Sequence, residues 1–257
     1  MKKYVLAAVI LLCGCSIADL RMGHSQGDFS AADLDKGRDL LKQVAAQGGY
    51  ATDNNYSYLD ATLVDNWSMT LLRWLTPVRS NHQKMHFTFG LKNIDVLMAY
   101  LDGPGVGDKV GIKDGKTFKE IKGRDVYKNF HDVEIYCMHM RRYFVWPYTL
   151  AKMPVVAFLG EGNLHGQDYD LVFTGLSTKK ANNKEDQYIL WVNRQTKQVD
   201  YVEFTLRDLL SALHGVVAYK DYRDAGGVKF AYDITLLNSL YGEGYAHHLV
   251  VESVQLH

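Results

Sequence analysis

Segments that each contain two strands around a tight turn constrain the fold of this chain more than any other feature. Residues 110–121 read VGIKDGKTFKEI, with strand-like arms on either side of Asp114-Gly115, a dipeptide typical of hairpin turns. Residues 188–207 read YILWVNRQTKQVDYVEFTLR and turn within Arg194–Lys197. The two arms of a hairpin run antiparallel, so these segments predict an antiparallel sheet.

A third hairpin is expected over residues 216–236, with its turn at Asp224–Gly227. Its second arm alternates apolar and polar side chains, the pattern of a strand with one face in the core. The apolar positions are Val228, Phe230, Tyr232, Ile234 and Leu236. A last strand is expected from His248 to Leu256, and successive hairpins predict one large sheet of meander type.

Two segments have the spacing of helices. Residues 33–47 lie between Ser30, a candidate N-terminal cap, and Gly48-Gly49, a candidate stop. Their helical repeat is Leu34, Arg38, Leu41 and Ala45. The second stripe is Phe130, Val133, Cys137, Met140 and Phe144, and we expect Pro147 to end that helix. The fold class is therefore α+β, with an N-terminal helix, a large curved antiparallel sheet and a second helix, residues 130–146, that covers the sheet.

The N-terminus has the organisation of an export signal. Lys2 and Lys3 precede an apolar run from Val5 to Leu12, and small residues follow it. The run is too short to span a bilayer, which takes about 20 apolar residues. An exported chain is therefore expected.

The end of this signal, Leu12-Cys13-Gly14-Cys15, resembles the lipobox of bacterial lipoproteins. The resemblance implies that Cys15 becomes the lipidated N-terminus, with fatty acyl chains such as palmitate, and that Cys13 leaves with the signal. The alternative is an ordinary secretory signal with an incidental cysteine. Ser16, rather than Asp, after the cysteine resembles the pattern of lipoproteins sorted to the outer membrane on its periplasmic side.

Composition and spacing give the domain organisation. We expect residues 1–14 to be the signal peptide, 15–32 a lipidated tether and 33–257 a single domain. Hydrophobic residues make up 47% of the chain, enough for a sizeable core, and the net charge is zero. A near-neutral domain does not favour nucleic-acid binding. Cys137 is then the one remaining cysteine, so no internal disulfide is expected.

Motifs that could support catalysis or metal binding are weak. Cys137-Met138-His139-Met140 has soft ligands that suit copper, but neither a helix nor a strand gathers all four on one face. His82 and His86 lack the glutamate of the zinc-protease motif, and His247-His248 would point to opposite faces of a strand. The glycine-rich stretch at 160–170 is expected to be a surface loop. We predict no catalytic residues, no metal and no cofactor.

The aromatic inventory supplies the remaining candidates. Each large aromatic is either a core residue or part of the wall of an apolar ligand cavity between sheet and helix. The candidates for such a cavity are Trp67, Trp74, Phe89, Phe144, Trp146, Trp191, Phe204 and Phe230.

Two segments, YILWVNRQTKQVDYVEFTLRD and YKDYRDAGGVKFAYDITLL, resemble hairpins of the LolA/LolB-like lipoprotein-carrier superfamily. The resemblance implies an incomplete β-barrel over 33–257 whose concave face, covered by a helix, takes acyl chains or another hydrophobic ligand. The lipid anchor resembles the receptor-like LolB branch rather than the soluble carriers.

The sequence thus favours a membrane-anchored envelope lipoprotein that binds a lipid or acyl chain, without covalent chemistry, in lipid or lipoprotein transport. One alternative is a structural or protein-interaction lipoprotein with a filled core and an envelope protein as partner. The other is an envelope hydrolase with a dispersed site.

Overall fold

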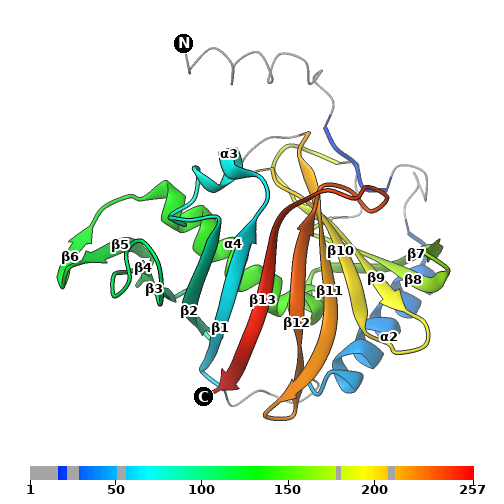
Figure 1. Ribbon diagram of the computed structural model, residues 1–257. Helices are drawn as coiled ribbons and strands as arrows, with labels where there is room; N and C mark the ends of the chain where they lie inside the picture. The colour runs from blue at the N-terminus through cyan, green and yellow to red at the C-terminus, as the bar shows by residue number, and fades with distance from the viewer. Residues whose placement is uncertain (1–16, 22–28, 51–55, 178–180, 208–211) are drawn as a thin grey trace.

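One continuous antiparallel sheet organises the molecule. The computed structural model describes residues 17–21, 29–50, 56–177, 181–207 and 212–257, and these form a 13-stranded sheet in the order β6-β5-β4-β3-β2-β1-β13-β12-β11-β10-β9-β8-β7 (Figure 1). The strands are β1 (Tyr58–Trp67), β2 (His82–Gly90), β3 (Val96–Tyr100), β4 (Lys109–Lys113), β5 (Lys116–Ile121), β6 (Arg124–Tyr127), β7 (Val155–Leu164), β8 (Gln167–Gly175), β9 (Gln187–Asn193), β10 (Val199–Thr205), β11 (His214–Ala225), β12 (Val228–Leu237) and β13 (Tyr245–Leu256). The edge strands β6 and β7 do not pair with each other, so the curved sheet is an open barrel.

The expected hairpins are confirmed. Asp114 and Gly115 both take positive φ, 50° and 72°, between β4 and β5, as a two-residue hairpin turn requires. The other two hairpins form from β9–β10 and β11–β12, and β13 closes the chain against β12 and β1.

The prediction of a surface loop at residues 160–170 is wrong. This stretch belongs to β7 and β8, which pair antiparallel around a two-residue turn at His165 and Gly166, both with positive φ. The glycines mark a bend in the strand, where the pairing shifts between Phe158 and Gly160, rather than the end of regular structure.

The sheet has an apolar concave face and a largely polar convex face in its central strands. Along β1, Leu59, Ala61 and Leu63 are buried on the concave side. Asp60 and its neighbour Thr62 point the other way, where the side chain of Asp60 meets His86 and His257. This alternation explains why the concave face needs a cover.

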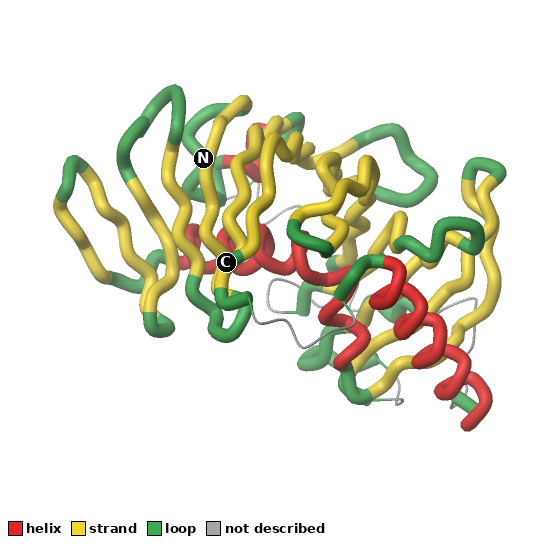
Figure 2. The backbone as a smooth tube through the Cα atoms, turned by 90° about the horizontal axis from the view of Figure 1, so that it is seen from below, coloured by secondary structure: helices red, strands yellow, loops and turns green. Residues whose placement is uncertain are grey.

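Helix α4 (His131–Thr149) supplies that cover, lying inside the curve of the sheet (Figure 2). The expected stripe is confirmed, because Val133, Cys137 and Met140 are fully buried and Phe144 is 3% exposed. Pro147 does not end the helix, which continues to Thr149. The missing N–H removes one helical hydrogen bond, and Pro147 lies so close to the helix end that little further helix depends on it.

Helix α2 (Ala31–Gln47) packs along the β7 edge, and its predicted ends are confirmed. Ser30 forms a reciprocal capping box with Asp33, and Gly48 caps the C-terminus. The buried positions are Gly37, Leu40, Leu41 and Val44. Of the predicted repeat only Leu41 is among them, so the buried face lies to one side of the predicted one. A Cβ on Gly37 would lie 2.6 Å from the Ala157 carbonyl carbon of β7, which explains the close approach of helix and strand.

Part of the predicted tether lies against the convex face. Leu20 N–H donates to the Gln187 side chain at 3.0 Å, Arg207 donates to the Ala18 carbonyl, and Arg21 is 2% exposed.

Cys13 and Cys15 lie outside the described residues. Within the described part of the chain, no helix combines the length and hydrophobicity needed to span a bilayer.

Candidate functional site

The interface between α4 and the concave face brings together most of the predicted site residues. Six of the eight aromatics share one buried cluster with α4: Trp67, Phe89, Phe144, Trp146, Phe204 and Phe230. Trp191 belongs to a second cluster on the convex face, and Trp74 is 62% exposed in the segment after β1. The structure therefore places neither of these two at the interface with α4.

Aromatic pairs join the helix to the sheet. Phe144 of α4 lies 5.3 Å from Phe89 of β2, and Trp146 lies 4.9 Å from Phe204 of β10, measured between ring centroids. Trp146 also meets Tyr188 of β9 edge-on at 5.5 Å. Such pairs add about 0.5–1.5 kcal/mol each beyond the burial of their surface. The helix is thus held mainly by apolar contact.

A buried carboxylate interrupts this apolar interface. Asp65 of β1 is completely buried, and its Oδ2 accepts hydrogen bonds from Tyr136 Oη of α4 at 2.6 Å and from Trp67 Nε1 at 2.7 Å. Its Oδ1 pairs with Nδ1 of His247 in β13 at 2.9 Å. Trp67 and His247 are opposed in the register of β1 and β13, and their rings stack at 4.3 Å. We call Asp65, Trp67, Tyr136 and His247 the Asp65 cluster.

The sequence pattern did not predict the Asp65 cluster. A signal was present, because the alternation of β1 places Asp65 on the same face as Leu59, Ala61 and Leu63. A carboxylate on an apolar strand face needs buried donors to stay there. The donors come from β13 and α4, far away in the sequence, so the pattern alone did not supply them.

Further polar contacts fasten α4 along its length. Lys119 of β5 pairs with Asp132 at 2.8 Å near the start of the helix. Arg141 donates from Nε to the Gly90 carbonyl at 2.8 Å and from Nη2 to the Asn93 carbonyl at 3.1 Å. These contacts lie at the border of the interface and are partly open to water, so they weigh less than the Asp65–Tyr136 bond.

The interface is closely packed around the C-terminal half of α4. The space between Pro147 and strands β11 and β12 has no room for a water molecule. Tyr219 of β11 lines this space, is 1% exposed, and its hydroxyl has no hydrogen-bond partner within the described structure. Burial raises the pKa of Tyr219 well above its ordinary value, so the hydroxyl keeps its proton and stays an unused donor.

Cys137, Met138, His139 and Met140 do not converge. Cys137 and Met140 are fully buried against the sheet, as the core interpretation predicted, and burial raises the pKa of the Cys137 thiol far above its usual range. No group of three or more metal-ligand side chains occurs among the residues that the structure describes. His248 lies on the convex face beside Asp233, opposite to buried His247, as expected for neighbours in a strand.

We expect the burial of His139 to make the free energy of unfolding depend on pH. Its Nδ1 donates to the Ile135 carbonyl at 2.7 Å, while its Nε2 is buried without a partner in the described structure, and this burial lowers the pKa of His139 to about 4. The unfolded chain binds this proton near pH 6.5, so the free energy of unfolding should fall as pH drops from 6.5 towards 4. Urea titrations of His139→Gln should show a shallower fall. His131→Gln, at an exposed position of the same helix, is the matched control, and equal slopes in both variants would contradict the prediction.

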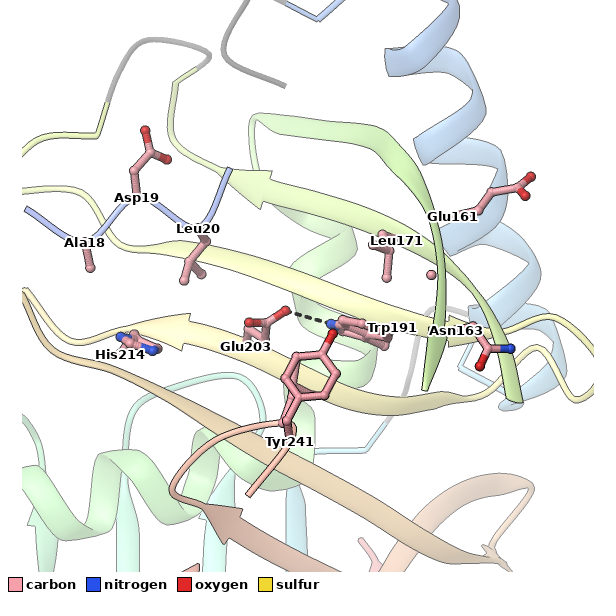
Figure 3. Close-up of a pocket in the computed structure, with 12 residues that line it drawn as sticks. Ala18, Asp19, Leu20, Glu161, Asn163, Leu171, Trp191, Glu203, His214 and Tyr241 are labelled. Carbon is pink, nitrogen blue, oxygen red and sulfur yellow. Dashed lines mark hydrogen bonds between the residues drawn. The ribbon is translucent and has the colours of Figure 1, made fainter. Parts of the chain in front are cut away.

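The convex face carries a groove of about 550 Å³ near the N-terminal segment (Figure 3). Its floor is Trp191, whose Nε1 donates to Glu203 Oε1 at 2.7 Å, and Gly162 leaves room for the indole ring. Asp19 and Glu161 also line it, so carboxylates surround the small apolar floor. Burying an acyl chain here would remove water from those carboxylates, which makes the groove a poor lipid site.

Comparisons with known proteins agree on the fold. No family model matches the sequence, and no curated protein matches it. Among solved structures, the chain is similar to a domain described as an outer membrane lipoprotein-sorting protein from Vibrio parahaemolyticus, with a TM-score of 0.53, 12% identity, and coverage of 87% of this chain and 93% of that one.

Two further solved structures give the same result. A DUF1329 family protein from Desulfovibrio piger matches with a TM-score of 0.52 and 11% identity over 87% of this chain and 93% of that chain. A LolA superfamily protein from Nitrosomonas europaea matches with a TM-score of 0.50 and 10% identity over 86% and 93%. The chain therefore shares its overall fold, an open antiparallel sheet with a helix inside its curve, with these three solved structures.

Proposed function

We propose that this protein is a lipid-anchored binding protein of the bacterial envelope that holds a lipid or acyl chain between α4 and the concave face of the sheet. Cys15 carries the anchor, and the protein acts in lipid or lipoprotein transport at the outer membrane, facing the periplasm. The fold shared with a lipoprotein-sorting domain supports this role. No covalent step and no cofactor are part of the proposal.

The observation that carries the proposal is that helix α4 lies over the apolar concave face, with α2 beside it at the β7 edge. Helix α4 contacts β3, β4, β5, β10 and β12, so moving this one element would open an apolar surface across the sheet. An acyl chain placed there would regain about 0.8 kcal/mol per buried methylene. The helix then acts as a lid that competes with the ligand for the same surface.

The polar groups at this interface suit a ligand that replaces the helix. The hydroxyl of Tyr219, which has no partner among the described residues, would find an acceptor in the ester or carboxylate oxygen of a lipid. Opening must break the bond from Tyr136 to the completely buried Asp65 and the bond from Tyr148 to the Lys229 carbonyl of β12. The other donors to Asp65 come from the sheet. We therefore infer that the Tyr136–Asp65 bond is the latch of the lid.

Weakening this latch should speed both opening and ligand uptake. In Tyr136→Phe, the loss of a hydrogen bond to a carboxylate, worth about 1.5–3 kcal/mol, should raise the open population about tenfold or more. Cys137, buried under the helix as a protonated thiol, should be alkylated correspondingly faster by iodoacetamide. Uptake of pyrene-labelled palmitate by the full mature chain should accelerate in parallel.

Tyr169→Phe is the matched control, because Tyr169 donates to Asp200 at 3.1 Å on the convex face, away from α4. This variant loses a tyrosine–carboxylate bond as well, but it should leave alkylation and uptake unchanged. If alkylation and uptake accelerate equally in both variants, general destabilisation of the fold explains the effect. If Tyr136→Phe opens the helix and no labelled palmitate binds at any concentration, the concave face is a filled core, and an interaction protein becomes the better interpretation.

A further inference from the structure

A second surface of the molecule is unusually apolar for an exposed one. Within residues 69–75, Leu71 is 72% exposed and Trp74 and Leu75 are each 62% exposed, with Met69 and Leu72 at 40%. They belong to the segment that contains α3 (Thr70–Arg73) and joins β1 to β2. A concentration of large apolar side chains in water is typical of an interaction site.

Hydrogen bonds hold this segment in place. Ser68 and Met69 donate their N–H groups to the Ala246 carbonyl at 3.1 and 3.3 Å, which ties the start of the segment to β13. Arg73 turns back to donate to the Val78 carbonyl at 2.9 Å and the Asn81 side chain at 2.6 Å. The one charged side chain of residues 69–75 is therefore engaged within the segment, and the exposed groups around it are apolar.

The same end of the molecule carries the N-terminal segment. The connection between β12 and β13 contains Tyr241, which is 77% exposed, and it ends at β13, where Ser68 just before α3 bonds to Ala246. Tyr241 lines the convex groove together with Ala18, Asp19 and Leu20. Figure 1 shows α3, this connection and the N-terminal segment at one end of the strands, and the C-terminus at the other.

We propose that this end docks onto a lipid bilayer, with Leu71, Trp74 and Leu75 in the interfacial region and exposed Tyr241 at the same end of the strands (Figure 1). The proposal rests on the lipidation of Cys15 proposed above. Only Ser16 separates Cys15 from Ile17, so the acyl chains are attached within about 7 Å of the described chain. An anchor this short brings the α3 end, rather than the opposite end, to the membrane.

The chemistry of the patch favours a bilayer over a protein partner. Tryptophan and tyrosine prefer the membrane interface, and leucine side chains reach the acyl boundary. The guanidinium of Arg73, the one charged group of residues 69–75, keeps polar acceptors from the Val78 carbonyl and the Asn81 side chain when the segment leaves water. Docking should therefore occur on neutral lipid, without the anionic headgroups that a basic surface would need.

Tryptophan fluorescence tests the proposal directly, because Trp74 is exposed while the other three tryptophans are at most 9% exposed. The mature full-length protein is reconstituted in phosphatidylcholine vesicles, and mass spectrometry verifies the acyl mass on Cys15. Brominated phosphatidylcholine should quench Trp74, and aqueous iodide should not reach it. Trp74→Phe should remove the bromolipid-quenched component and assign it to this residue.

Paired variants separate docking from anchoring. Leu71→Ser with Leu75→Ser should abolish bromolipid quenching and restore iodide quenching, without loss of the acyl anchor. Ile94→Ser, an equally apolar site that is 50% exposed at the opposite end of β2, should change neither. Iodide access to Trp74 in the unsubstituted, acylated protein would overturn docking while leaving the anchor intact. Shielding of Trp74 from both quenchers would also overturn docking on a bilayer and indicate a protein partner or a second copy. A missing acyl mass on Cys15 would remove the anchor on which the docking proposal rests.

Discussion

Replacing Asp65 with leucine is expected to lower the free energy of unfolding by about 3–5 kcal/mol, the range seen when one partner of a buried charged network is removed. Leucine fills nearly the same volume but accepts no hydrogen bond. Three donors, from Trp67, Tyr136 and His247, would then be buried without a partner. Each unsatisfied donor costs about 1–3 kcal/mol. Chemical denaturation of the full chain measures the change.

Two companion variants make the test specific. Asp65→Asn keeps one oxygen for Tyr136 and Trp67 and turns an N–H towards His247, so its cost should fall between that of leucine and zero. Asp60→Leu makes the same change on the same strand but on the convex face, where Asp60 meets His86 and His257 in partial contact with water. There we expect a loss of no more than about 1 kcal/mol. If both leucine variants cost the same, the buried bonds of Asp65 carry no special weight.

The hairpins and helices could be predicted because their signals are local. Asp114-Gly115 favours one turn geometry, Ser30 caps a helix through its own neighbours, and Cys137 and Met140 follow a helical repeat. The stretch at 160–170 misled because glycine suggests a loop, whereas here Gly160 bends a long strand and Gly162 makes space for Trp191. That role depends on a ring from β9, which no local pattern contains.

The candidate site was predicted by residue type and not by position. Aromatic composition indicated an apolar interface, and six of the eight candidates lie together beneath or on α4. Trp191 and Trp74 were grouped with them because sequence does not state which face of the sheet a distant strand presents. Their separate locations, in the floor of the convex groove and on the exposed α3 segment, follow from strand register and from the connection after β1.

If α4 is a lid, substitutions at the contact between Trp146 and Phe204 should have the largest effects on ligand affinity. Their rings lie 4.9 Å apart, one on the helix and the other on β10, so either substitution by alanine removes the same contact. Each change should lower the free energy of unfolding by about 3–5 kcal/mol. The effects on ligand affinity should differ, because only Phe204 belongs to the surface that the ligand would occupy.

Trp146→Ala should tighten the binding of pyrene-labelled palmitate, since the helix then competes less well for the sheet. Each 1.4 kcal/mol by which the closed state is weakened raises the apparent affinity about tenfold, until the open state predominates. Phe204→Ala opens the lid too, but it removes part of the binding wall, so its gain should be smaller or absent. Trp146→Phe, a milder change, preserves the comparison if the alanine variant unfolds.

The sign of the Trp146 effect decides between the two roles of the helix. Tighter binding in Trp146→Ala than in Phe204→Ala means that helix and ligand exclude each other from the concave face. Equal weakening in both variants means that the helix is part of the binding wall and stays in place when the ligand binds. Val126→Ala, at an exposed position on the edge strand β6, should leave fatty-acid affinity unchanged and so verifies that the readout reports on the concave face.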